Sequence, residues 1–419
     1  MTPTDRQRTD ATDGRLRGRR HAWVNRGVAG IGVASFLDDA GQEVPTALLP
    51  AFLTSTLGAP AAALGAIEGV AEGLAGAARL AGGALADDPE RRRRTAVGGY
   101  AGTAALSALI GVATAIWQVG LLRSGAWLMR GLRTPARNAL LADVASPATY
   151  GRAYGFERAM DNLGAIVGPL LALALVAAAG VRTAIVLSVI PGTLAAIAIA
   201  IAASGARSAG GPRRPLRLRI RPVLVGDLGR LVGGISAFEL GNVAATLLIL
   251  RATELLASEH GHDAAVQLAL LLYAGYNVAA TALSVPAGQF VDRRGSGSVL
   301  VIGIAASLGA YVGFALTGAS LLVLLFLFAA AGAGNGLAAT AEHAGVAALA
   351  PEGLRGSAFR VLAAVQSVGK FAASAVAGLL WTLVSPRASF LYLAAWMLVG
   401  IVLVGRARTG LGRGCSSMS

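Results

Sequence analysis

Residues 83–88 read G-A-L-A-D-D, and residues 288–295 read G-Q-F-V-D-R-R-G. The glycine and the aspartate of the first stretch recur in the second at a constant offset of 205 residues. The same offset relates two further pairs of glycines elsewhere in the chain. The matched positions are Gly83 with Gly288, Asp87 with Asp292, Gly151 with Gly356, and Gly164 with Gly369. The sequence therefore predicts two structurally related halves.

The composition indicates a membrane protein. Of the 419 residues, 55% are hydrophobic and 14% are charged, whereas soluble domains carry about 25% charged residues. About twelve apolar segments are each long enough to cross a bilayer as a helix. They cover residues 24–50, 62–86, 95–115, 117–141, 155–179, 183–203, 223–250, 265–290, 297–317, 319–349, 357–383 and 387–405. We expect an all-α membrane protein of twelve transmembrane helices in two pseudo-symmetric six-helix halves, which places a substrate site between the halves.

The charged residues follow the pattern of a topology signal. The formal net charge is +14, and the arginines gather before the first apolar segment and after the even-numbered segments. This asymmetry predicts a multi-pass protein of the plasma membrane with both termini in the cytoplasm. Because the basic residues have this explanation, nucleic-acid binding is not expected, and the lipid bilayer is the expected partner.

The topology divides the chain into five regions. They are an N-terminal tail at 1–23, the first six-helix half at 24–203, a Gly/Pro/Arg-rich linker at 204–222, the second half at 223–405 and a C-terminal tail at 406–419. The only cysteine, Cys415, lies in the last tail, and His260 and His262 have no third ligand near them in the sequence. We therefore expect no metal site and no cofactor. The expected state is a monomer.

The repeated stretches resemble the signature of the major facilitator superfamily of secondary transporters, and the resemblance extends over essentially the whole chain. The signature, G-x-x-x-D-[RK]-x-G-[RK], is matched in the second half by Gly288, Asp292, Arg293 and Gly295. The first half keeps Gly83, Asp87 and Arg91 but has Asp88 and Glu90 at the usual arginine and glycine. The resemblance implies a transporter of a small molecule.

A second element of this family is G-x-x-x-G-P in the fifth helix, present here as Gly164, Gly168 and Pro169. In the family the pattern is associated with proton-driven exporters. The residues alone also fit a bend with close helix contact, because glycine and proline are common in membrane helices for that reason. Stretches at 132–143, 156–165 and 377–381 resemble a bacterial subgroup whose substrates are mostly unassigned.

Charged residues within the apolar segments mark the expected cavity, because a charge in hydrocarbon usually faces a partner or water. The resemblance implies that helices one, four, seven and ten line this cavity. The candidates for binding substrate or protons are Asp38, Asp39, Arg123, Glu239 and Asn242. The two aspartates lie near the bilayer midplane, which suits a proton carrier, and Arg123 is their expected partner. An ordinary ion pair in the cavity wall is the alternative, and adjacency leaves open which aspartate faces the cavity.

Helices two and eleven meet between the halves in this family, which suggests gating contacts. Lys370 is the only lysine, and Glu72 lies at a matching depth in the second helix. We expect a Glu72–Lys370 ion pair with Glu68 as a second acceptor, acting either as a gate that opens on protonation or as a fixed structural pair. Asp161, one turn from Glu157 in the fifth helix, is grouped with these interface residues.

The two halves also show a reciprocal exchange of charge at the offset of 205. Asp88 matches Arg293, and Arg137 matches Glu342. The simplest expectation is one contact within each half, Asp88–Arg137 in the first and Arg293–Glu342 in the second. In the family, arginines of the signature form cytoplasmic charge networks that break when the protein opens inward.

These observations favour a proton-coupled exporter that works by alternating access. One alternative is a proton-coupled importer of a small organic solute or metal chelate. Another is a family member that no longer transports and acts as a sensor. An enzyme is not expected, because the sequence has no paired histidines, no nucleophile elbow and no metal-spaced ligands on any helix. Transport driven by ATP is not expected either, because the sequence has no phosphate-binding loop.

Overall fold

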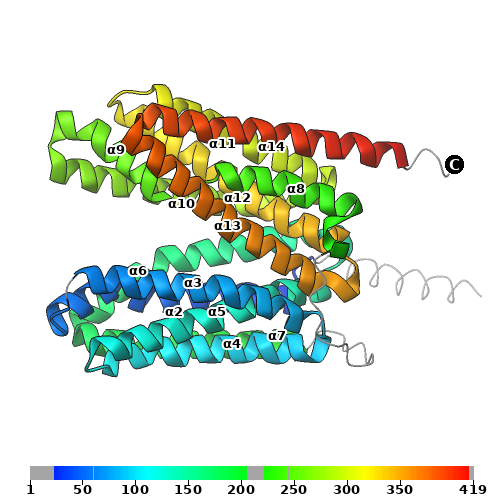
Figure 1. The fold of residues 1–419 in the computed structure, drawn as a ribbon. Helices are drawn as coiled ribbons and strands as arrows, with labels where there is room; N and C mark the ends of the chain where they lie inside the picture. Colours follow the sequence, from blue (N-terminus) through cyan, green and yellow to red (C-terminus); the bar gives the residue numbers. More distant parts are fainter. Residues whose placement is uncertain (1–22, 60, 205–220, 244, 415–419) are drawn as a thin grey trace, which may run out of the picture.

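The computed structural model describes residues 23–59, 61–204, 221–243 and 245–414. Within these residues the fold is helical and contains no strand. The helices form two bundles, one from each half of the sequence, that lie side by side (Figure 1). Residues 1–22, most of the predicted linker, Cys415 and the side chain of His262 lie outside what is described. Among the described residues, no three His, Cys, Asp or Glu side chains gather to hold a metal ion.

The first bundle is built from six helices. They are α2 (Arg26–Ala51), α3 (Ala61–Ala86), α4 (Pro89–Leu109), α5 (Ile116–Val144), α6 (Tyr150–Leu187) and α7 (Val189–Ser204). Helix α6 is interrupted at Gly180, which has φ 77° and ψ 168°. Glycine adopts this positive φ without the clash that a side chain would cause. The end of α6 and α7 together form the sixth pass of the chain through the bundle.

The second bundle contains seven helices that make six passes. They are α8 (Gly226–Gly241), α9 (Ala245–His260), α10 (His262–Arg294), α11 (Ser296–Leu316), α12 (Leu321–Leu349), α13 (Arg355–Leu383) and α14 (Pro386–Gly414). The seventh predicted segment, 223–250, was expected to be one helix, and this was wrong. Helix α8 ends at Gly241, and Asn242 has non-helical φ −86° and ψ 90°. The seventh pass is therefore a broken helix formed by α8 and α9.

Six helical segments of the described chain are long and apolar enough to cross a bilayer, by length and composition alone. Others are less apolar because they carry charges inside the bundle. Helix α2 contains Asp38, Asp39 and Glu43, and α5 contains four arginines. Buried charges of this kind need partners or water. These helices are thus expected to surround a polar site rather than to face lipid all round.

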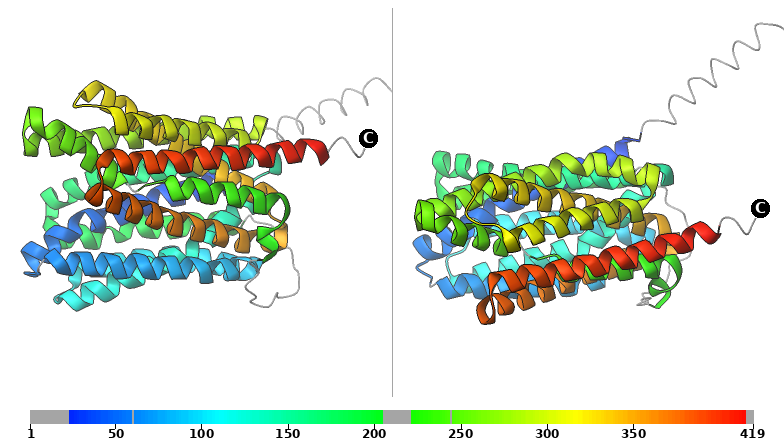
Figure 2. Two further views of the ribbon diagram at one scale, coloured as in Figure 1. Left: turned by 45° about the horizontal axis from the view of Figure 1, so that its top comes forward. Right: turned by 90° about the horizontal axis from the view of Figure 1, so that it is seen from above.

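One end of the molecule carries most of the exposed arginines and is called here the arginine-rich end. Arg93 and Arg94 lie there at the start of α4, and Arg293 and Arg294 lie there at the end of α10. The end of α14 also belongs to it, and Figure 2 shows this helix projecting from the bundle. The charge asymmetry of the sequence is thus gathered at a single end of the fold.

Near the arginine-rich end the bundles touch through two matched helix pairs, α3 with α13 and α6 with α10. The backbones approach closely at the repeated glycines. A methyl group added to Gly83 would lie 2.8 Å from the carbonyl oxygen of Gly356, and one added to Gly288 would lie 2.2 Å from that of Gly151. Small residues permit such close packing between membrane helices. Four of the repeated glycines, Gly83, Gly151, Gly288 and Gly356, therefore form part of the contact surface between the two halves.

Candidate functional site

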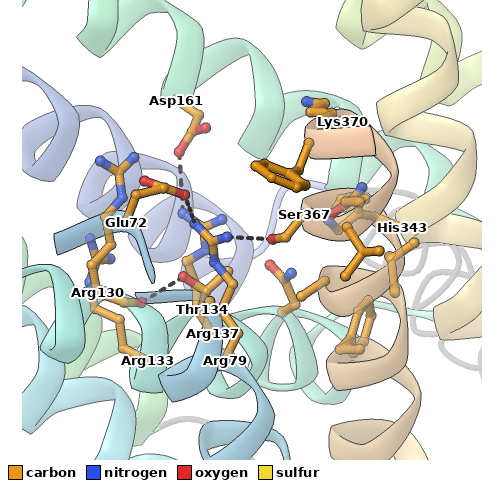
Figure 3. Close-up of a pocket in the computed structure, with 18 of the residues that line it drawn as sticks. Glu72, Arg79, Arg130, Arg133, Thr134, Arg137, Asp161, His343, Ser367 and Lys370 are labelled. Atoms are coloured by element: carbon orange, nitrogen blue, oxygen red, sulfur yellow. Dashed lines mark hydrogen bonds and ion pairs between the residues drawn. The ribbon is translucent and has the colours of Figure 1, made fainter. Parts of the chain in front are cut away.

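A cavity of about 870 Å³ lies between the two bundles (Figure 3). Its walls come from α2, α3, α5 and α6 of the first bundle and from α12 and α13 of the second. The charged residues that line it are Asp39, Glu72, Arg79, Arg130, Arg133, Arg137, Arg158, Asp161 and Lys370. A cavity lined by a few placed polar groups selects a ligand by hydrogen bonds and charge. This cavity therefore suits a small polar or charged molecule.

Helix α5 supplies most of the positive charge, and its arginines pair with the two aspartates of α2. Arg130 Nη2 lies 3.2 Å from Asp39 Oδ1, and Arg130 Nη1 donates to Gln42 Oε1 at 3.1 Å. Arg133 pairs with Asp38, and only 2% of its side chain is exposed. Asp38 also accepts a hydrogen bond from Gln42. Charge-assisted hydrogen bonds of this kind hold buried charges in place.

The structure distinguishes the two aspartates. Asp39 lines the cavity, whereas Asp38 is not part of its wall. The predicted pairing of Arg123 with these aspartates was wrong. Arg123 Nη2 lies 2.9 Å from Glu68 Oε1, and Arg123 Nη1 donates to Thr46 Oγ1 at 3.2 Å. Arg123 therefore joins α5 to α3 and α2, while Arg130 and Arg133 are the partners of the aspartates.

A second ion-pair cluster joins α5 to α6. Arg137 Nη1 lies 3.0 Å from Glu157 Oε1 and 3.2 Å from Asp161 Oδ1. It also donates to Ser35 Oγ at 3.2 Å. Arg158 Nη1 lies 3.3 Å from Asp161 Oδ2, so two arginines face two acids. Asp161 reaches the cavity wall as part of this cluster.

The predicted Asp88–Arg137 contact was therefore wrong, and the structure gives Asp88 another role. Asp88 is the N-cap of α4, where its Oδ1 accepts from the backbone nitrogens of Glu90 at 3.0 Å and Arg91 at 3.2 Å. Pro89 follows as the first helical residue. Aspartate at an N-cap satisfies N–H groups that have no partner in the helix. This local role explains an aspartate where the family signature has a basic residue.

The matching contact predicted in the second half, Arg293–Glu342, was wrong as well. Arg293 is exposed at the end of α10, whereas Glu342 is buried within α12. Glu342 Oε2 accepts instead from Gln366 Nε2 of α13 at 2.7 Å. Gly295 ends α10 with φ 80°, and its N–H donates to the carbonyl of Val291 at 2.8 Å. The glycine of the signature thus serves the turn between α10 and α11.

The predicted Glu72–Lys370 ion pair is not formed in this conformation, so that prediction was wrong. Glu72 Oε1 lies 3.5 Å from Arg79 Nη2 on its own helix. Lys370 makes no ion pair with any residue that the structure describes, and it faces the cavity. Arg79 Nη1 donates instead to Ser367 Oγ of α13 at 2.6 Å (Figure 3). Arg79 and Ser367 therefore make the contact between α3 and α13 that sequence reasoning assigned to other residues.

Two repeated aspartates fasten the bundles together at the arginine-rich end, and their contacts are called here the closing contacts. Asp87 Oδ1 accepts from the backbone nitrogen of Ser357 at 2.8 Å. Asp292 Oδ1 accepts from the backbone nitrogen of Gly151 at 2.7 Å, and its Oδ2 accepts from Arg152 Nε at 2.6 Å. Each carboxylate thus meets the first turn of a helix of the other bundle, where unpaired N–H groups favour negative charge.

Three aromatic side chains close the cavity above the closing contacts and are called here the aromatic floor. The ring of Tyr154 lies 5.8 Å from that of Phe359 and 6.0 Å from that of His343. The His343 and Phe359 rings are stacked at 6.2 Å. His343 and Phe359 line the cavity, and Tyr154 is fully buried. The cavity is therefore closed on the side of the arginine-rich end.

The G-x-x-x-G-P motif brings α6 against the charged part of α2. A methyl group added to Gly164 would lie 2.9 Å from Asp39 Cβ, and one added to Gly168 would lie 2.3 Å from Glu43 Cβ. Pro169 follows within α6. Any larger residue at these glycines would push α6 away from α2. The motif therefore sets the position of Asp39, which lines the cavity, and of Glu43 one turn further along α2.

The predicted cavity residues of the seventh pass lie behind the cavity wall. Glu239 and Asn242 are both buried, and neither lines the cavity. Asn242 Nδ2 donates to Glu239 Oε2 at 3.1 Å, across the end of α8. The prediction that they contact the cavity directly was therefore wrong, although both lie within the second bundle close to α13.

Sequence reasoning missed Arg130, Arg133, Tyr154 and Phe359 as residues of the site, and it named Arg137 but with another partner. Arg130, Arg133 and Arg137 recur at intervals of three and four in α5, and that spacing places them on one helix face. Tyr154 and Phe359 of the aromatic floor are related by the same offset of 205 as the repeated glycines. Both signals are visible in the sequence. The pairing of each arginine with its acid is not, because it depends on how α5 rotates against α2 and α6.

Comparison with known proteins gives one family. Residues 31–250 and 231–411 match the model of the Major Facilitator Superfamily. An uncharacterized MFS-type transporter of Methanocaldococcus jannaschii is 28% identical over 371 residues. The match covers 88% of this chain and 92% of that relative.

Solved structures agree in fold. A bacterial homologue of the iron transporter ferroportin, crystallised in an outward-facing state, superposes with a TM-score of 0.73 at 13% identity. That match covers 92% of this chain and 100% of the other. A proton:xylose symporter superposes with a TM-score of 0.69 at 14% identity, over 92% of this chain and 96% of the other. At such identities the likeness concerns the fold alone.

Proposed function

The chain belongs to the Major Facilitator Superfamily of membrane transporters, and from this membership we propose that it exports a small polar molecule in exchange for protons. Secondary transport is the activity that the family and the fold support. Export, proton coupling and the residues involved are our proposal. Alternating access supplies the mechanism, because two related halves can rock about a site between them.

The observation that carries this proposal is a charged cavity closed on one side only by contacts between the bundles. The cavity has about 870 Å³ and charged walls from both halves. Below it lie the aromatic floor and the closing contacts of Asp87 and Asp292. These contacts join surfaces of the two bundles and can separate without unfolding either bundle. Separation would expose the cavity to the arginine-rich end.

We place the arginine-rich end in the cytoplasm, with the protein as a monomer in the plasma membrane. The exposed arginines at this end support the orientation, because cytoplasmic loops of membrane proteins carry an excess of arginine and lysine. In this orientation the described conformation faces outward, and the cytoplasmic side is shut. A transport cycle then alternates this state with one in which the closing contacts are broken.

Export is supported by the G-x-x-x-G-P motif and its contacts. In this family the motif is associated with proton-driven exporters, and here it holds α6 against Asp39 and Glu43 of α2. Acids that face the cavity can exchange protons or bind positively charged groups as exposure changes. We therefore assign Asp39, Asp161, Arg130 and Arg137 to the substrate site, and Lys370 to its wall on the second half.

The test is accumulation of fluorescent cations, antibiotics and siderophore-like chelates in cells that express the protein. Each compound is measured with and without a proton uncoupler, beside the Asp39→Asn variant. We expect lower accumulation that the uncoupler abolishes and that the variant loses. Higher accumulation that the uncoupler abolishes would instead establish import and contradict export.

A matched control is available on the surface. Glu90 forms an exposed ion pair with Arg94 at 2.6 Å, far along α4 from the cavity. The Glu90→Gln variant removes one carboxylate, as Asp39→Asn does, and should keep wild-type accumulation at equal membrane abundance. Wild-type accumulation that matches empty cells for every compound would contradict export of this panel.

A further inference from the structure

Helices α5 and α12, the fourth passes of the two halves, differ in charge at matched positions. Helix α5 carries arginines that neutralise the acids of the first bundle, and α12 lacks them. At the offset of 205 the matched residues are Arg130 with Asn335, Arg133 with Ala338, and Arg137 with Glu342. The acids of the second bundle therefore have no arginine from their own fourth helix.

One contact occurs in both halves and shows what this difference does. In the first half, Arg137 Nη1 meets Asp161 Oδ1 at 3.2 Å. The matched residues are Glu342 and Gln366, and Gln366 Nε2 donates to Glu342 Oε2 at 2.7 Å. The first contact is between opposite charges. The second is between a carboxyl group and a neutral amide, so the carboxyl charge is not balanced there.

Glu342 is deeply buried in this position. Only 1% of its surface is exposed, and its Oε1 has no hydrogen-bond partner among the described residues. Glu239 of α8 is 2% exposed, and its Oε2 accepts from the neutral amide of Asn242 at 3.1 Å. Gly369 of α13 packs against Glu239, since an added methyl would lie 2.5 Å from Glu239 Cβ. Two buried acids thus lie against α13, at contacts three residues apart along the helix.

The charged and titratable groups around these acids come from several helices. Glu239, Glu342 and Lys370 interact electrostatically with one another. Arg158 of α6 also acts on Glu342 but is engaged by Glu157 and Asp161. His343 follows Glu342 in α12 and packs in the aromatic floor. The remaining groups are Tyr276 of α10 and Tyr311 of α11, which interact with Glu239.

Lys370 is therefore the one cation available to two buried acids within the described part of the second bundle. If both acids were ionised, the group would carry one uncompensated negative charge in a low-dielectric interior, which is costly. One proton on the acid pair removes that charge, because one carboxylate then faces one ammonium. This charge balance follows from the two acids, the single lysine and their burial, all within the second bundle.

We propose that Glu342 and Glu239 together hold one exchangeable proton, with Lys370 as the counter-charge, and that this pair is the coupling site of the transporter. The proposal rests on proton coupling as part of the proposed function. It assigns the coupling proton to acids of the second bundle rather than to the aspartates of α2. Gln366 and Lys370 both line the cavity. They therefore lie between the two buried glutamates and the interior of the cavity. The proton comes from a hydronium ion in the cavity, whose O–H bond breaks as an O–H bond forms on one carboxylate. After the halves rock, that carboxyl group returns the proton to water on the opposite side of the membrane.

The test is infrared difference spectroscopy of the purified protein in detergent, titrated with acid and base in the absence of substrate. A protonated carboxyl group gives a carbonyl stretch that disappears on ionisation. We expect this band in the wild type and its loss in both Glu342→Gln and Glu239→Gln. Either substitution leaves one acid that pairs with Lys370 and stays ionised. The Lys370→Met variant should show about twice the band area, because both acids then hold protons.

Glu90→Gln is the matched control, since it removes one exposed carboxylate that pairs with Arg94 away from the cavity. It should keep the full band. Survival of the band in both glutamine variants, with each variant eluting as a single folded species, would overturn the proposal. Loss of the band on adding sodium chloride but not potassium chloride would also overturn it, because the pair would then be a metal-cation site. A normal band in a protein that fails the accumulation assay would contradict the proposed transport function alone.

Discussion

Gly288 and Gly151 lie so close that a methyl group added to Gly288 would come within 2.2 Å of the carbonyl oxygen of Gly151. The matched pair, Gly83 and Gly356, is also crowded, because a methyl group on Gly83 would lie 2.8 Å from the carbonyl oxygen of Gly356 and one on Gly356 would lie 2.5 Å from that of Gly83. The two bundles therefore meet at two places of the same construction. Each place joins one repeated glycine of a signature stretch to one glycine at the start of a helix of the other half.

Replacing Gly288 with alanine should open the arginine-rich end. Overpacking of this kind costs about 1–3 kcal/mol, and each 1.4 kcal/mol changes an equilibrium about tenfold. The strain exists only in the closed state, so the open state gains population. Spin labels on cysteines at positions 93 and 294, in a Cys415→Ser background, should report a longer distance between the bundles.

The control for that measurement is Gly309→Ala in α11. An added methyl at Gly309 meets nothing within 4 Å, so the distance between the labels should equal that of the parent protein. An unchanged distance in Gly288→Ala as well would show that the glycine contact does not hold the bundles together.

The two closing contacts should contribute unequally to stability. Asp292 accepts from the Arg152 side chain at 2.6 Å as well as from backbone nitrogens, whereas Asp87 accepts from the backbone nitrogen and the hydroxyl of Ser357. A double-mutant cycle of Asp292→Asn with Arg152→Gln should give a coupling of about 0.5–3 kcal/mol. The cycle of Asp87→Asn with Ser357→Ala should give less, because hydroxyl donors are weaker than charged ones. Thermal unfolding in detergent measures both, and equal couplings would contradict the prediction.

Removing one partner of the Asp38–Arg133 pair should lower the free energy of unfolding strongly, whereas replacing both partners should lower it much less. Arg133 is 2% exposed, and removing one partner of a buried pair costs about 3–5 kcal/mol because it leaves an uncompensated charge. Asp38→Asn should therefore lower the unfolding midpoint strongly, and Asp38→Asn with Arg133→Met should recover much of the loss. Asp227→Asn is the control, since its pair with Arg230 at 2.7 Å is exposed and worth about 0–1 kcal/mol. A double variant no more stable than Asp38→Asn would refute the account.

Removing a ring from the aromatic floor should let protons leak through the protein. Phe359→Ala removes a ring that contacts both Tyr154 and His343. Water can then enter between the cavity and the closing contacts, because no neighbouring ring can fill the space without moving a helix. Liposomes with this variant should lose an imposed proton gradient faster than wild-type liposomes. Phe371→Ala, which lines the cavity away from the floor, should not change the rate, and equal rates for all three would argue against a sealing role.

The sequence was sufficient for the fold because its signals are long and repeated. Apolar segments of helical length and the offset of 205 define the number of passes and the two halves. The glycine matches indicated the duplication, and the structure shows that four of these glycines lie between the halves. The break at Asn242 was missed because the apolar pattern continues through it.

The ion pairs were poorly predicted, and the reason is geometric. Matching depths suggested Glu72 with Lys370, but arginine side chains are long, and Arg79 on the same helix reaches Glu72 first. The matched charges Asp88 and Arg137 suggested a contact, but Asp88 satisfies the first turn of α4. Local backbone groups compete with distant side chains, and a sequence does not show which of them wins.

The closing contacts have the form of a homodimer interface contained in one chain. In a twofold dimer, a residue i touches j of the partner while j touches i, and here Asp292 meets residues 151–152 while Asp87 meets residue 357. In a dimer of two identical chains, every mutation would change both contacts at once. In a single polypeptide each contact can vary alone. At the offset of 205, Arg152 of one contact matches Ser357 of the other. The two closing contacts occupy matched positions in one polypeptide, so each can differ in strength from the other.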